Sequence, residues 1–78
     1  MSDQLAAIGP ALRALREDRG LRQYVLAEQA GITKAMLSAY ENGKRRPSLG
    51  TLDRILAALG AQWRDLAYAM VRVEQGQR

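Results

Sequence analysis

The sequence predicts an all-α protein, and three observations lead to this prediction. Apolar residues recur every three to four positions in several segments, which is the spacing of one helix face. Glycine or an Asn–Gly pair follows these segments where a helix would end. No segment shows the alternating pattern of a β-strand. We expect one domain of five helices, because a chain of 78 residues has material for only one core.

The first predicted helix starts at Gly9 and Pro10, because proline is favoured in the first turn of a helix. It should run to about Arg19, where Gly20 can adopt the left-handed conformation that ends many helices. Residues 1–7 come before this start, and we expect them to form a flexible arm outside the core.

Two short helices that meet at a tight corner are predicted over residues 23–30 and 34–41. Gly31 lies at the corner, where the chain must turn sharply through a positive φ. Thr33 is a good N-cap for the second of these helices, and the Asn–Gly pair at residues 42–43 can end it. The residues expected to form the apolar underside of both helices are Leu26, Ala30, Ile32, Leu37 and Tyr40.

Two further amphipathic helices complete the predicted helical core of residues 8–74, which leaves a polar tail at residues 75–78. Ser48 can cap the first of them and Gly60 can end it. Its apolar stripe is expected to comprise Leu49, Leu52, Ile55, Leu56 and Leu59. The last helix is expected over about residues 62–73. Its apolar stripe is expected to comprise Trp63, Leu66, Ala67, Met70 and Val73.

The charge of the chain favours an anionic partner. The net charge is +4 and the isoelectric point is near 10.1, and arginine carries most of the excess. Its planar guanidinium group suits phosphate oxygens. Lys44, Arg45 and Arg46 form a basic run, and no acidic residue lies between Asn42 and Asp53. We therefore expect the positive charge to gather on one side of the fold.

The residue inventory argues against catalysis and against a bound metal. The sequence has no histidine and no cysteine, which removes the usual general base, the thiol nucleophile, and the nitrogen and sulfur metal ligands. Gly43 and Lys44 do not complete a phosphate-binding loop of the nucleotide-hydrolase type, because Ser38 stands where its first glycine is needed. We expect no enzymatic activity, no metal and no cofactor.

The start of the chain, MSDQLAAIG, lacks the basic region and the long apolar run of a signal peptide. No run of 18 apolar residues occurs anywhere in the sequence. We expect a cytoplasmic protein that associates with the nucleoid and not with a membrane.

The two short helices leave an outward surface that is polar or basic and contains no acid. A DNA groove lined by phosphates would accept such a surface. The residues that we expect on it are Arg22, Gln23, Thr33, Lys34, Ala35, Ser38 and Ala39.

Taken together, these segments resemble the lambda-repressor-like, Xre-type helix-turn-helix family of bacterial and phage transcriptional regulators. The resemblance covers residues 8–66, and three segments carry it. They are IGPALRALREDRGL, the helix-turn-helix QYVLAEQAGITKAMLSAYENG, and RRPSLGTLDRILAALGAQWRDL. The resemblance implies a five-helix DNA-binding domain with the helix-turn-helix at its second and third helices.

The family's docking mode implies that the third helix lies in the DNA major groove. The residues that would face the bases are Thr33, Lys34, Ala35, Ser38 and Ala39. The residues that would contact backbone phosphates are Arg22, Gln23, Asn42, Lys44, Arg45 and Arg46. Two alanines on the reading face limit hydrogen bonding to bases, so operator selection is expected to depend partly on DNA shape.

Three charged positions either match or depart from the pattern of this family. Arg16 and Glu41 match residues that often form an ion pair in this family, where it joins the first helix to the end of the third. Arg22 departs from the family, which usually places serine, threonine or asparagine there to cap the second helix. A cation at this helix end is unfavourable by itself, and a bound phosphate would reverse that effect, so we interpret Arg22 as a backbone contact.

Two functions follow as hypotheses. The first is a homodimeric regulator of transcription that binds a roughly palindromic operator in double-stranded DNA, with repression as the favoured mode of action. Its dimer would form through the last helix, with Trp63, Met70 or Val73 across a two-fold axis. The alternative is an antitoxin or another protein-interaction module that holds a toxin or a second regulator mainly through this same helix.

Overall fold

The computed structural model describes residues 4–76, and all of its regular secondary structure is helical, as the sequence predicts. Within these residues no β-strand occurs. None of the helices in this range is long and apolar enough to cross a membrane. The elements are the 3-10 helix η1 (Gln4–Ala7) and the α-helices α1 (Ile8–Asp18), α2 (Gln23–Ala30), α3 (Lys34–Glu41), α4 (Leu49–Leu59) and α5 (Trp63–Glu74).

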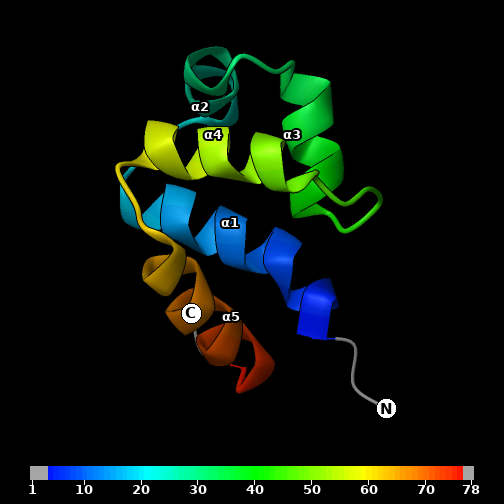
Figure 1. The fold of residues 1–78 in the computed structure, drawn as a ribbon, viewed down its shortest axis with the longest axis vertical. Coiled ribbons are helices and arrows are strands. Elements are labelled where there is room, and N and C mark those ends of the chain that lie inside the picture. The colour runs from blue at the N-terminus through cyan, green and yellow to red at the C-terminus, as the bar shows by residue number, and fades with distance from the viewer. Residues whose placement is uncertain (1–3, 77–78) are drawn as a thin grey trace.

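Helix α1 runs through the middle of the molecule and separates α5 from the other helices (Figure 1). It packs against α5 on one side and against α3 on the other, while α2 contacts both α3 and α4. In Figure 1, α2 and α3 lie at the end of the molecule opposite α5. The helix-turn-helix and the last helix therefore present separate surfaces.

The core forms where α1, α2, α3 and α4 meet. The largest side chains that are fully buried in it are Leu12, Leu26, Leu37, Ile55 and Leu56. Four of the five residues predicted for the underside of the helix-turn-helix are buried, and Ile32 is half-buried at the edge of the core. The predicted packing of α2 and α3 is therefore confirmed.

Local signals set the helix ends. Thr33 Oγ1 accepts a hydrogen bond from the Met36 amide at 3.0 Å, and Ser48 Oγ accepts one from the Thr51 amide at 3.1 Å. Gly31 ends α2 with φ 73°. These features confirm the predicted limits of α2, α3 and α4. Helix α5 begins one residue later than expected, because Gln62 acts as its N-cap within a capping box.

The prediction of a flexible arm before α1 is corrected for residues 4–7. This segment is a 3-10 helix that contacts α5, and Ala7 is buried. Helix α1 begins at Ile8, so Pro10 is its third residue. Proline is tolerated there because the first four amides of a helix have no partner within it. The rest of the predicted arm, residues 1–3, lies outside the described residues.

Two residues of the predicted apolar stripes are also corrected. Leu49 is 76% exposed, because it lies in the first turn of α4 and the buried stripe starts one turn later, at Leu52. Ala67 is exposed, because the side of α5 that faces the core passes through Leu66 and Ala69 instead.

Helices α1 and α3 approach each other most closely at Gly9. A Cβ atom at this position would clash with the carbonyl oxygen of Tyr40 and would lie 2.9 Å from that of Glu41. Glycine is therefore required here for the close packing of two backbones, and not only as part of a helix start.

Candidate nucleic-acid interface

The start of α3 is accessible, as a helix that enters a DNA groove requires. The side chains of Thr33, Lys34 and Ala35 are exposed, and those of Ser38 and Ala39 are half-buried. Helix α3 lies at the edge of the molecule in Figure 1. All five residues predicted to face the bases thus come from the N-cap and one helix, although Ser38 and Ala39 protrude less than the first three.

Two hydroxyl groups on this surface are already oriented by hydrogen bonds. Thr33 Oγ1 accepts from the Met36 amide, and Ser38 Oγ accepts from Asn42 Nδ2 at 3.2 Å. Each oxygen is used here as an acceptor, so each hydroxyl keeps its own proton for donation. The surface therefore offers two hydroxyl donors beside the ammonium group of Lys34.

The residues at the start of α2 were predicted to contact phosphate, and they have different surroundings. Arg22 is exposed, occupies the N-cap with extended backbone, and makes no capping hydrogen bond. Gln23 is half-buried, and its Nε2 donates to Glu41 Oε1 at 3.0 Å. An amide carries two N–H groups, so Gln23 keeps one of them for another acceptor.

The ion pair predicted between Arg16 and Glu41 is present. Arg16 Nε donates to Glu41 Oε2 at 2.8 Å, and Arg16 Nη2 donates to Glu41 Oε1 at 3.0 Å. Arg16 Nη1 also donates to the carbonyl oxygen of Leu21 at 2.7 Å. The hydrogen bonds to Glu41 raise the pKa of Arg16, although burial acts in the opposite direction. Arg16 therefore stays charged, and its guanidinium ties α1 to α3 and to the chain before α2.

The basic run after α3 begins close to the C-terminal end of that helix. The backbone amides of Lys44 and Arg45 both donate to the carbonyl oxygen of Ala39, at 2.9 and 3.3 Å. The side chains of Lys44, Arg45 and Arg46 are exposed. The start of α2, with Arg22 and Gln23, is thus one segment that adjoins α3, and this basic run is another.

A shallow depression of about 480 Å³ joins the starts of α2 and α3 to the side of α1. The sequence predicts DNA contacts for several of the residues that line it, but not for Arg13. No pattern in the sequence marks Arg13, because it becomes part of the surface only when α1 packs beside α3. The residues that line the depression are Arg13, Arg16, Arg22, Gln23, Tyr24 and Lys34.

A sequence profile of the helix-turn-helix family matches residues 12–66. The chain therefore belongs to the Xre-type helix-turn-helix family, a class of DNA-binding transcriptional regulators.

Two solved structures share this fold over most of their length. The clp gene regulator ClgR from Corynebacterium glutamicum superposes with a TM-score of 0.85 at 30% identity, over 94% of this chain and 95% of its own. The restriction-modification controller protein C.AhdI from Aeromonas hydrophila gives a TM-score of 0.75 at 34% identity, over 80% of this chain and 94% of its own.

Curated relatives include the immunity repressor protein of Bacillus phage phi105, which is 38% identical over 70% of this chain. The transcriptional repressor RghR of Bacillus subtilis is 36% identical over 91% of this chain. The match covers 38% of the phage repressor and 53% of RghR, so the chain spans only about a third to a half of these relatives.

Proposed function

We propose that this chain is a sequence-specific DNA-binding regulator of transcription, with repression as its favoured mode of action. It acts in the cytoplasm by placing α3 in the major groove. The exposed, acid-free surface at the start of α3 is the observation that supports this most directly. Its neighbours at the start of α2 and after α3 are basic. The relatives named above as repressors and regulators support the same class of function.

Bases would be read by few polar groups. Lys34 is suited to the acceptor atoms of guanine, and the methyl group of Ala35 can contact the methyl group of thymine. The hydroxyls of Thr33 and Ser38 can donate to a base or to a nearby phosphate. Ala39 adds another methyl group, but it is half-buried. So sparse a set implies that DNA shape and half-site spacing supply part of the specificity.

Phosphate contacts would hold α3 in place from both of its ends. Arg22 and the remaining N–H of Gln23 would bind the backbone beside the start of α3. Asn42 and the basic run of residues 44–46 would bind the backbone beside its C-terminal end. These contacts would orient the reading helix without selecting a sequence.

Replacing Lys34 by alanine is expected to weaken binding to the preferred operator by about 1–3 kcal/mol and to relax selection at one base pair per half-site. The operator would first be obtained by selecting bound duplexes from random DNA. Affinities would then be measured by titration against that operator and its single-pair variants.

Lys44→Ala is the matched control, because it removes the same charge from the basic run instead of from the reading surface. It should weaken binding almost equally on all sequences and reduce the salt dependence by about one phosphate contact. If Lys34→Ala behaves in the same way, Lys34 is a phosphate contact and not a base reader. If no duplex is enriched by the selection, the proposed function itself is wrong.

A homodimer is proposed to form through α5, but not through all the residues expected from the sequence. Met70 and Val73 pack against the core of their own chain. Trp63 is 46% exposed and Val71 is 50% exposed. These two residues and the exposed Ala67 follow one another at intervals of four and share one side of the helix.

This spacing supports an antiparallel crossing of two copies of α5. With Ala67 on the two-fold axis, Trp63 of each copy would pack against Val71 of the other, and the small alanines would let the helices approach closely. Two reading helices on the same DNA face would then meet a roughly palindromic operator with half-sites about 34 Å apart.

Ala67→Arg is expected to convert a dimer into a monomer, because it would place two like charges at the crossing point. The fold should survive, since Ala67 is exposed. Gln29→Arg, at an exposed position on α2, is the control and should remain dimeric. Sedimentation with and without operator DNA is the measurement, and a wild-type protein that is monomeric in both conditions would contradict the dimer.

The exposed aromatic residues of α5 also support a second candidate function. Trp63 and Tyr68 would serve equally well as a surface for another protein, such as the toxin partner of an antitoxin. A partner that co-purifies at high salt and is lost in Ala67→Arg would favour this alternative. Steeply salt-dependent binding to the selected operator would favour the regulator.

A further inference from the structure

The depression beside the starts of α2 and α3 has the composition of a site for an anion. Four of its six lining residues are cationic and none is acidic. They come from three separate parts of the fold, with Arg13 on α1, Arg22 at the N-cap of α2 and Lys34 on α3. Folding thus gathers like charges around one concave surface, which favours the binding of an anion there.

These cations are not equally available. Arg16 is neutralised by Glu41, and its Nε, Nη1 and Nη2 atoms all donate hydrogen bonds within the protein. By contrast, the side chains of Arg22 and Lys34 are exposed and have no hydrogen-bond or ion-pair partner among the described residues. Their charges are therefore open to a ligand.

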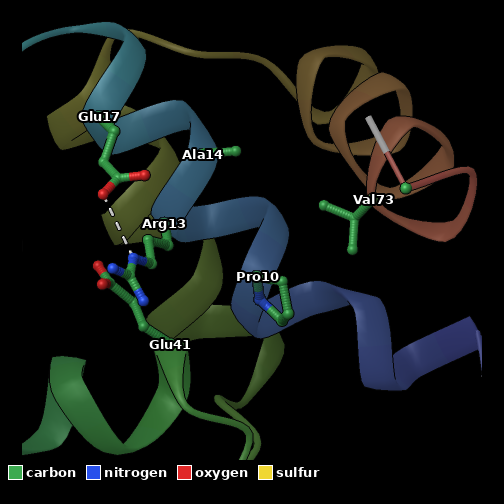
Figure 2. Close-up of a pocket in the computed structure, with 7 residues that line it drawn as sticks. Pro10, Arg13, Ala14, Glu17, Glu41 and Val73 are labelled. Atoms are coloured by element: carbon green, nitrogen blue, oxygen red, sulfur yellow. Dashed lines mark hydrogen bonds and ion pairs between the residues drawn. The ribbon is translucent and has the colours of Figure 1, made fainter. Parts of the chain in front are cut away.

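Arg13 is in an intermediate situation. Its Nε donates to Glu17 Oε2 at 3.3 Å, and the two side chains are 46% and 43% exposed. Figure 2 shows the Arg13 guanidinium with the carboxylates of Glu17 and Glu41 nearby, at a second depression between α1 and α5. The Glu41 carboxylate is already occupied by Arg16 and Gln23. The ion pair with Glu17 is long and exposed to water, so it is weak. It is the one hydrogen bond or ion pair that the Arg13 side chain makes among the described residues.

We propose that Arg13 is a further DNA-backbone contact. Its side chain separates from Glu17 and binds a phosphate that lies in the depression beside Arg22 and Lys34. This inference rests on the proposed function, because it takes the anion to be a phosphate of the operator. Arg13 borders both the depression and the Glu17 carboxylate, so rotation of its side chain exchanges one partner for the other. Glu17 thereby competes with DNA for Arg13.

The experiment measures operator affinity as a function of salt for the full chain, three variants and one control variant. Arg13→Gln is expected to lower affinity about fivefold on all sequences and to reduce the salt dependence by about one phosphate contact. Glu17→Gln is expected to raise affinity about twofold, because it removes the competitor. In the double variant, Glu17→Gln should have no effect, because Arg13 is absent.

Arg54→Gln is the matched control, because it removes the same charge from an exposed site on α4 that lines a different depression. A second readout locates the contact on the DNA: neutral methylphosphonates replace one phosphate of the operator at a time. The wild type should lose about fivefold at one phosphate per half-site, and Arg13→Gln should lose nothing further there.

The possible outcomes separate this inference from the proposed function. If Arg13→Gln binds the operator like Arg54→Gln, or if every methylphosphonate weakens both proteins equally, Arg13 does not contact the backbone although the protein binds DNA. If Glu17→Gln strengthens binding even without Arg13, Glu17 acts by general repulsion and the exchange of partners is wrong. Failure of every protein to bind any duplex would overturn the proposed function instead.

Discussion

Replacing Glu41 by glutamine is expected to lower the free energy of unfolding by about 3 kcal/mol, because it leaves a charged, partly buried guanidinium without its anion. Glu41 is only 4% exposed, and it accepts two hydrogen bonds from Arg16 and one from Gln23. Glutamine keeps the size of the side chain but replaces one acceptor oxygen by a donor that would face other donors. Thermal unfolding should show a melting temperature about 15 °C lower.

The double variant Arg16→Met and Glu41→Leu serves as the control for this prediction. It removes both charges together, and an apolar pair of similar size often restores the stability that a half-removed pair loses. Its unfolding free energy should lie closer to that of the wild type than to that of Glu41→Gln. A change below about 1 kcal/mol in Glu41→Gln would show that water or rearrangement compensates the guanidinium, and that the pair is not a structural requirement.

The same network connects stability to the proposed DNA contact. Gln23 is held by Glu41, so its second N–H has a defined direction before any phosphate arrives. The double variant should remove that hold without a large loss of stability. It is therefore expected to bind the operator more weakly than the wild type even where both proteins are fully folded.

Most of the fold could be predicted from the sequence because its signals are local. Thr33 and Ser48 satisfy amides three residues further on, and Gly31 and Gly60 adopt the left-handed conformation at helix ends. Such features depend on neighbours in sequence, which a reader of the chain can see. The ends of α2, α3 and α4 were accordingly predicted without error.

The two errors in the apolar stripes share one cause, which is that burial depends on residues far away in the sequence. Apolar periodicity marks one side of a helix, but it does not say where the neighbouring helices stop. Leu49 extends the stripe of α4 beyond its contacts and is exposed. On α5, Ala67 belongs to the outward side, while Ala69 and Leu66 face the core.

The candidate site was predictable to a similar degree. Residues of the helix-turn-helix could be recognised from the local sequence, but a residue from another helix could not. Lys34 and Arg22 occupy recognisable positions in a helix-turn-helix, and both are exposed as expected. Arg13 occupies no such recognisable position, because its place beside them depends on how α1 packs against α3. Only the assembled fold shows which cations share a surface.

Gly9→Ala is expected to destabilise the protein by about 3 kcal/mol, even though alanine is normally the better helix former. The added Cβ would clash with the backbone oxygen of Tyr40, and backbone atoms cannot rotate away as a flexible side chain can. Relief would require α1 and α3 to separate, which would strain the contacts that place α3. Urea unfolding should give a lower midpoint with a similar slope.

Gly50→Ala provides the opposite result with the same chemical change. Gly50 lies in the first turns of α4, where an added Cβ would approach Ser48 Oγ no closer than 4.0 Å. Without a clash, helix propensity decides the outcome, and stability should rise by up to about 1 kcal/mol. If both variants were stabilised, the close approach of α1 and α3 at Gly9 would be wrong, because propensity alone would then explain both results. Opposite signs would show that backbone contact between two helices, and not local preference, requires glycine at the start of α1.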